Sequence, residues 1–149
     1  MKRISKHISY KEATNSNYAK KHKIENKPND EQLENMQLVA KEVFEPLREW
    51  VGGPIKVNSF FRSADLNSGI NGSKTSSHLK GQAIDITSMG LKTNLEMFNY
   101  IKDNLEFDQL IWEYGKRNPK WLHVSFNGVK NRKQVLIIKE VGKYKYFKS

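Results

Sequence analysis

The sequence contains no cysteine, so disulfide bonds and thiolate metal sites are excluded. It also lacks any hydrophobic run long enough for a membrane-spanning helix. Residues 1–23 are basic and have no apolar segment of the kind found in a secretory signal peptide. We therefore expect a protein made in the cytoplasm without a signal peptide and without a membrane span. Its 149 residues suffice for one domain with its own hydrophobic core.

The net charge of +10 is concentrated at the two ends of the chain. Residues 1–27 hold eight basic and two acidic residues, residues 129–149 hold seven basic and one acidic, and the stretch between them carries −2. Such a basic periphery suits an anionic partner, namely nucleic acid, a membrane surface or anionic cell-wall polymers, although solvated basic faces also serve solubility alone. The Arg/Gly runs and aromatic motifs of nucleic-acid-binding modules are absent, so we expect no nucleic-acid partner.

Hydrophobic periodicity predicts a single domain over residues 1–149. It consists of a basic lead-in (1–28), a core (29–128) and a basic C-terminal strand and tail (129–149). Helical spacing and capping residues predict two main helices, over 29–50 and 93–105, and Pro46 should kink the first or end its regular part. Apolar and alternating stretches predict five strands, over 55–61, 81–86, 107–114, 121–126 and 134–141. We therefore predict an α+β fold in which a small antiparallel sheet is flanked by helices.

Two of the predicted strands carry polar side chains among apolar ones. In "QAIDI" the alternation of side chains places Asp85 on the face opposite Ile84, and in "WLHVSF" it places His123 opposite Leu122. A lone strand histidine is more often a packed or capping residue. A carboxylate in an apolar strand is less ordinary, because burying it is costly unless it is paired, hydrogen-bonded or bound to a metal. If the two strands pair, Asp85 and His123 project from the same face.

A second histidine lies close to this pair. His78 comes just before the strand that carries Asp85, and Gly81 between them allows the chain to bend tightly. Two imidazoles and one carboxylate leave one tetrahedral position open, which is the ligand count of a catalytic zinc site. The loop at 62–77 precedes this site, and polar loops of that length in a compact domain are usually functional.

Three separated motifs resemble those of one family. "SSHLKGQAID" matches the family's pattern S-x-H-x-x-G-x-A-x-D. Upstream, "VNSFFRS" is similar to a strand of the family that ends in a tyrosine or phenylalanine, an arginine and a serine, and "LN" follows it as in the family. Downstream, "WLHVSF" resembles the family's W-x-H-x-S/D strand, which carries its last metal ligand. Over residues 30–127 the chain resembles the D-Ala-D-Ala carboxypeptidase and L-alanyl-D-glutamate endopeptidase family of zinc peptidases, in its phage endolysin-like branch. The family shares its fold with lysostaphin-type peptidases and hedgehog domains.

The resemblance implies roles for individual residues. His78, Asp85 and His123 would bind one zinc ion. Arg62 would hold a carboxylate or carbonyl of the peptide, which suits the planar, two-pronged guanidinium. A solvent-exposed loop arginine is the alternative interpretation. Two serines, Ser76 and Ser77, would bind substrate or neighbouring groups, unless they only cap the loop.

The general base is where the sequence departs from the family. Many members have an acid three residues before the last histidine, and this chain has Lys120 there. The best replacement is Glu113 in "QLIWEYG", because phage-type members are similar in having an acid at this position. Alternation places Glu113 on one strand face with Ile111, and Tyr114 on the other. The alternative is an edge-strand glutamate paired with Lys116 or Arg117.

We therefore expect a monomeric zinc metallopeptidase of the D-Ala-D-Ala carboxypeptidase or L-alanyl-D-glutamate endopeptidase type. Its substrate would be an amide bond in peptidoglycan stem peptides. It would act at the bacterial cell wall, either as a phage or prophage endolysin released through lysis pores or as a virion component. Its basic ends would bind anionic wall polymers. Two alternatives stay open: a non-catalytic zinc-fold module that binds the wall or a virion partner, and a basic nucleic-acid-binding protein with a structural metal.

Overall fold

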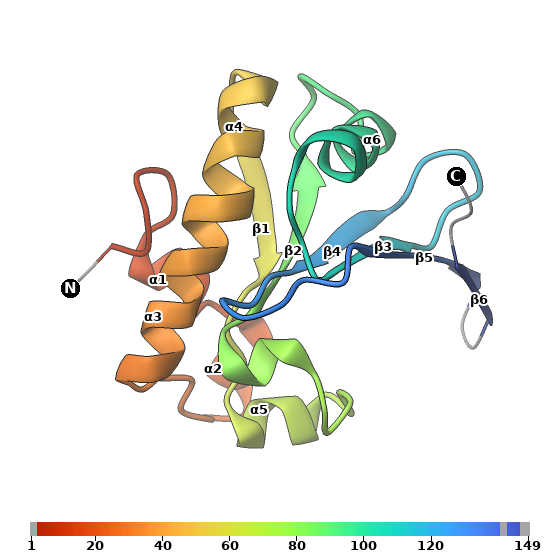
Figure 1. Ribbon diagram of the computed structural model, residues 1–149. Coiled ribbons are helices and arrows are strands. Elements are labelled where there is room, and N and C mark those ends of the chain that lie inside the picture. Colours follow the sequence, from red (N-terminus) through yellow and green to blue (C-terminus); the bar gives the residue numbers. More distant parts are fainter. Residues whose placement is uncertain (1–2, 141–142, 147–149) are drawn as a thin grey trace.

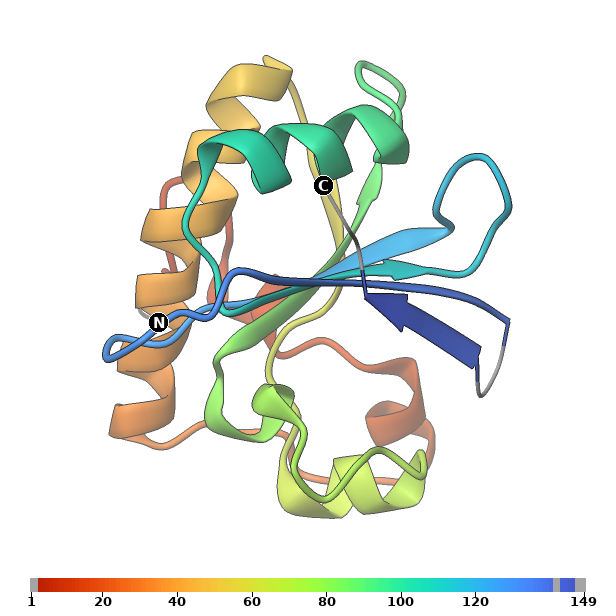
Figure 2. The same ribbon diagram turned by 45° about the vertical axis from the view of Figure 1, so that its right-hand side comes forward.

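The computed structural model describes residues 3–140 and 143–146, with side chains through residue 139. A six-stranded sheet with the strand order β1-β2-β4-β3-β5-β6 forms its centre. The strands are β1 (Ile55–Ser59), β2 (Ala83–Ser88), β3 (Gln109–Glu113), β4 (Trp121–Ser125), β5 (Gln134–Glu140) and β6 (Lys143–Tyr146). Helix α6 (Asn94–Asn104) lies at one end of the sheet and α5 (Ala64–Gly69) at the other (Figure 1, Figure 2). The predicted α+β fold is confirmed.

The first predicted helix is one continuous helical stretch with an irregular middle. It comprises α3 (Asp30–Val39), a π-helical turn η1 (Ala40–Phe44) and α4 (Glu45–Val51). Asn29 begins it with a capping box, and Pro46 lies in the first turn of α4. Because proline has no N–H for the bond to the preceding turn, the widened turn just before it breaks the regular helix, as predicted.

The core lies between this helical layer and one face of the sheet. Ile84 and Ile86 of β2 and Leu122 and Val124 of β4 are fully buried, and α3 and α6 both contact β2. These residues belong to one hydrophobic cluster with the inward faces of α3, α4 and α6. The predicted core faces of the two strands are therefore confirmed, and the polar side chains between these residues point to the opposite face. No helix in the described part of the chain is long and apolar enough to cross a membrane.

The sheet is mixed, whereas an entirely antiparallel one was predicted. Strand β5 runs parallel to β3, and the other four pairings are antiparallel. After β4 the chain returns to the start of β3, where Lys133 and Gln134 donate backbone bonds to Phe107 and Asp108. Arg132 binds the Asp108 carboxylate at the same point, with its Nε and terminal nitrogen each 2.9 Å from an oxygen. Strand β5 therefore starts beside the start of β3 and must run in the same direction.

The segment at 62–77 was predicted to be a long loop, and this prediction is wrong in part. It contains α5, whose first turn is capped by the Ser63 hydroxyl, and the start of the 3-10 helix η2 (Ser77–Lys80). Leu66 anchors α5 because its side chain is buried, and Asn67 is buried beside it. Local capping and one buried apolar residue thus order a stretch that has little hydrophobic periodicity.

The basic lead-in also has structure. It forms α1 (Tyr10–Ala13) and α2 (Asn17–Lys21), and Ile4 and Ile8 are buried in the main hydrophobic cluster. Glu45 at the start of α4 holds this segment, since its carboxylate accepts bonds from the Ser5 hydroxyl at 2.6 Å and the His7 backbone N–H at 2.9 Å. Residues 1–2 of the lead-in, and 141–142 and 147–149 of the predicted basic tail, lie outside the described residues.

Candidate metal centre

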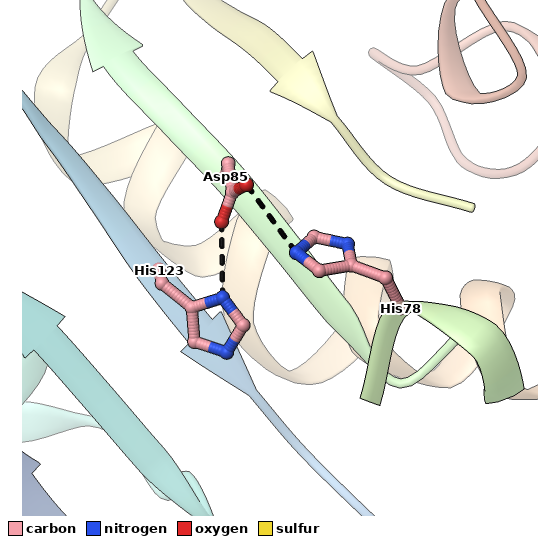
Figure 3. A group of neighbouring side chains, drawn as sticks. All are labelled: His78, Asp85 and His123. Atoms are coloured by element: carbon pink, nitrogen blue, oxygen red, sulfur yellow. Dashed lines mark hydrogen bonds and ion pairs between the residues drawn. The ribbon is translucent and has the colours of Figure 1, made fainter. Parts of the chain in front are cut away.

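Asp85 and His123 meet because β2 and β4 pair antiparallel with these two residues directly opposite each other. Oδ1 of Asp85 lies 3.0 Å from Nδ1 of His123. Both side chains extend from the face of the sheet opposite the helical core, and Figure 3 shows them with His78. The predicted juxtaposition of the two strands is therefore confirmed by their register.

His78 reaches the same point from η2. The Ser76 hydroxyl caps this short helix by accepting from the His78 N–H, and Gly81 ends it with a φ of +73°. The imidazole is 1% exposed, and its Nδ1–H donates to the Phe60 carbonyl at 2.7 Å. Its other nitrogen, Nε2, has no hydrogen-bond partner in the described part of the chain and lies 3.3 Å from Oδ2 of Asp85 (Figure 3).

The charges in this group are consistent with a neutral His78 beside an ionised Asp85. Burial lowers the pKa of His78, although the Asp85 carboxylate acts in the opposite direction. Burial alone would raise the pKa of Asp85, but the His78 and His123 rings hold it well below its usual value. With Nδ1–H committed to Phe60, Nε2 presents a lone pair to a carboxylate oxygen. Two acceptors this close repel each other unless a cation lies between them.

A zinc ion fits this donor set. One atom from each of His78, Asp85 and His123 lies within 4.8 Å of the other two. Two imidazole nitrogens and one carboxylate oxygen are a usual protein ligand set for catalytic zinc, and an ion there would give the orphaned Nε2 a partner. The bond from His78 to Phe60 would fix the ring and its tautomer, as outer partners of metal-binding histidines generally do.

Arg62 lies beside this group with much of its guanidinium out of solvent. Among the described residues its buried Nε has no hydrogen-bond partner, and a terminal nitrogen lies at the long distance of 3.5 Å from the Ser76 hydroxyl. Burial lowers the Arg62 pKa, which the charge of Asp85 partly offsets. A guanidinium with unused donors is suited to a carboxylate or carbonyl supplied from outside. Of the two serines, Ser76 contacts Arg62 and caps η2, whereas Ser77 makes backbone bonds and no side-chain bond to another described residue.

Glu113 lies on the same sheet face as the candidate ligands. Glu113 of β3 lies opposite Trp121 of β4, and Trp121 is two residues before His123 on that strand. The pKa of Glu113 is raised, mainly by burial. The charge of His123 acts to lower this pKa, and the charge of Asp85 acts to raise it. Within the described residues Glu113 has no ion pair with Lys116 or Arg117, so the alternative of a structural pair lacks the contact that it requires.

The family assignment follows from a comparison with known protein families. The family model for Peptidase M15 matches residues 6–125, most of the chain and all of the residues above. The chain belongs to the peptidase M15 family. It is therefore a metallopeptidase of a zinc-dependent family that acts on cell-wall peptides, and the predicted resemblance is confirmed. No curated protein matches the sequence significantly.

Two features of this M15 centre were not predicted from the sequence. The Phe60 carbonyl orients His78, and a backbone acceptor leaves no side-chain signal by which it could be found. Tyr114 was predicted to lie on the face opposite Glu113. Instead, it has a φ of +63° and its ring packs against Trp121, with 5.2 Å between ring centroids. The left-handed backbone ends the strand alternation at Glu113, which the residue types alone do not indicate.

Proposed function

We propose that this M15 chain is a zinc peptidase that hydrolyses an amide bond in peptidoglycan stem peptides, of the D-Ala-D-Ala carboxypeptidase or L-alanyl-D-glutamate endopeptidase type. The observation that carries the proposal is the convergence of His78, Asp85 and His123, with an unpartnered Nε2, beside a half-buried Glu113. The half-buried Arg62 next to Asp85, whose buried Nε has no hydrogen-bond partner among the described residues, supports a substrate that bears a carboxylate.

His78, Asp85 and His123 would hold the zinc ion. When bound, such an ion acidifies water and polarises the scissile carbonyl. Arg62 binds the peptide's carboxylate or carbonyl through two parallel hydrogen bonds and so orients the scissile bond.

Glu113 accepts a proton from the attacking water and passes it to the leaving amine. Because burial raises the pKa of Glu113, the group is a stronger base once ionised than an exposed glutamate. Lys120 is at the position where the family resemblance would place an acid, and its side chain is exposed. Because an ammonium group cannot accept a proton from water, we assign the role of base to Glu113.

The biological role that we propose is that of a phage or prophage endolysin, or of a virion-associated wall hydrolase. The protein would be made in the cytoplasm and reach the wall through lysis pores or with the virion. The resemblance to the phage-type branch supports this role. The basic ends of the chain would add attraction to anionic wall polymers.

The test is mass spectrometry of fragments released from purified peptidoglycan by zinc-loaded protein. We expect release of fragments with one new amine and one new carboxylate, loss of release with a chelator, and recovery with added zinc. His78→Ala should abolish release, whereas His22→Ala, a histidine outside the centre, should not. The fragment masses identify the bond.

A second function is favoured by Lys120, which replaces the usual acid. If folded, zinc-loaded protein releases nothing from several wall types, the chain is a non-catalytic module that binds the wall or a virion partner. In that case sedimentation with purified walls should still be observed.

A further inference from the structure

Tyr114 has an unusual conformation beside the proposed base. Its φ of +63° lies in the left-handed region, which is sterically unfavourable for a residue with a side chain. Glycine would adopt this conformation without that cost, and glycine follows at once in Gly115. A strained, bulky residue next to Glu113 suggests that the aromatic ring itself is needed there.

The left-handed conformation places the Tyr114 ring against Trp121. The centroids are 5.2 Å apart and the rings are inclined at 65°, an edge-to-face contact. Trp121 lies opposite Glu113 in the ladder and two residues before His123, so it shares their face of the sheet. Both aromatic residues are half-buried, and part of each side chain is open to solvent beside the metal centre.

The return at 114–120, which begins with Tyr114 and leads into Trp121 at the start of β4, is firmly anchored. Hydrogen bonds fix it to neighbouring strands and to the start of α6 at five points. The donor–acceptor pairs are Tyr114 N to Ile138 O at 2.5 Å, Trp112 Nε1 to Gly115 O at 2.9 Å, Leu95 N to Asn118 Oδ1 at 2.7 Å, and Asn94 Nδ2 to Pro119 O at 2.8 Å and Lys120 O at 3.1 Å. The rings therefore stand in a fixed position before any ligand arrives, which lowers the entropic cost of binding.

We propose that Tyr114 and Trp121 form an aromatic wall that binds a flat, C–H-rich part of the substrate next to the scissile bond. A pyranose ring of the glycan or an aliphatic side chain of the peptide has this chemistry. Rigid aromatic rings give large contact areas at low conformational cost, and the pair lies on the same face as His123 and Glu113. The inference rests on the proposed function and adds the substrate group that this side of the centre recognises.

The test compares Tyr114→Asn with Tyr114→Phe. Asparagine tolerates the left-handed conformation and removes the ring, whereas phenylalanine keeps the ring and removes only the hydroxyl. Tyr100→Ala is the matched control, because Tyr100 stacks on Trp50 at 4.3 Å, outside the metal centre. We expect Tyr114→Asn to raise KM about tenfold with kcat within about twofold, which corresponds to about 1.4 kcal/mol of binding. Tyr114→Phe and Tyr100→Ala should leave KM unchanged.

Calorimetry separates this inference from the proposed function. A stem peptide with and without its amino-sugar is titrated into zinc-loaded Glu113→Gln protein, with and without Tyr114→Asn. Weaker binding of only the sugar-bearing probe assigns the wall to the glycan, and weaker binding of both probes assigns it to the peptide. Equal affinities with and without Tyr114→Asn for both probes would overturn the inference, even if the wild type hydrolyses peptidoglycan. If the wild type shows no hydrolysis and Tyr114→Asn still weakens binding, the aromatic wall stands and the catalytic proposal fails.

Discussion

Asp85 and His123 are directly opposed in the β2–β4 ladder, with 3.0 Å between Oδ1 and Nδ1. The separation of these two candidate ligands is thus set by strand register, which is strongly specified because the opposite faces of both strands are buried. His78 comes from a short 3-10 helix and depends on local turn geometry. The candidate metal centre therefore combines two rigidly held candidate ligands with a third whose position depends on a single turn.

Asp85→Asn should remove the stabilisation that zinc gives to the folded protein. The amide keeps the shape of the carboxylate but loses its charge, and the two imidazoles alone bind the ion weakly. At a zinc concentration of 100 times the wild-type Kd, the wild type should gain about 2.7 kcal/mol in free energy of unfolding. Thermal unfolding with zinc and with chelator measures this gain. The exposed Asp103→Asn serves as control, and an undiminished gain in Asp85→Asn would exclude Asp85 as a ligand.

Gly81→Ala should loosen the metal centre through the backbone. A Cβ there would lie 2.5 Å from the Gln32 carbonyl oxygen, and the φ of +73° is itself strained for alanine. We expect a loss of at least roughly 1–2 kcal/mol in free energy of unfolding, together with weaker zinc binding, because the turn joins His78 to the strand of Asp85. Gly52→Ala is the matched control, since Gly52 has a φ of +80° and its Cβ would meet nothing within 4 Å. Equal zinc affinities in both variants would contradict the expectation.

Glu113→Gln should lower kcat by about 10²–10⁴-fold if Glu113 is the general base. The substitution keeps the size of the side chain and removes its ability to accept a proton, so zinc content and unfolding should stay close to wild type. Lys120→Gln, at the position where the family resemblance would place an acid, should change kcat by only a few-fold. A large loss in Lys120→Gln with little loss in Glu113→Gln would reverse the two assignments.

Arg62→Lys should weaken binding of substrates with a free carboxylate. The ammonium keeps the charge but cannot form two parallel hydrogen bonds to a carboxylate. We expect KM to rise about tenfold, equivalent to about 1.4 kcal/mol, with a smaller change in kcat. A peptide whose carboxylate is amidated gives the internal comparison, because wild type and variant should bind it alike. A similar KM increase for both peptides would indicate that Arg62 acts on the fold of the site.

Glu45→Gln should remove a part of the stability that depends on pH. Burial acts to raise the Glu45 pKa, but bonds from Ser5 and His7 outweigh it, and the pKa is lower in the folded state than the usual 4.5. The carboxylate therefore stabilises the fold above the unfolded pKa, and this contribution is lost as pH falls through the folded pKa. We expect Glu45→Gln to cost about 1–2 kcal/mol at pH 7 and much less near pH 3. Urea unfolding at the two pH values measures the difference, and an equal cost at both would contradict the carboxylate's role.

The sequence by itself determined the elements that carry the candidate ligands. The alternation in "QAIDI" and "WLHVSF" separates a buried face from a polar one, since side chains in a strand point to opposite sides. The capping residues Asn29 and Thr93 marked the starts of α3 and α6 for a similarly local reason. These features depend on neighbours within a few residues, so the chain's own pattern suffices to predict them.

Only the tertiary structure decided features that depend on contacts between distant segments. The parallel pairing of β5 with β3 results from the path of the chain after β4, and the partner of His78 Nδ1 is a carbonyl 18 residues away. The left-handed Tyr114 is held against its intrinsic preference by the bond that its N–H donates to the Ile138 carbonyl of β5 and by the bond that its own carbonyl accepts from the Lys120 N–H. In each case long-range hydrogen bonds and packing outweigh local propensity, and no short stretch of sequence records them.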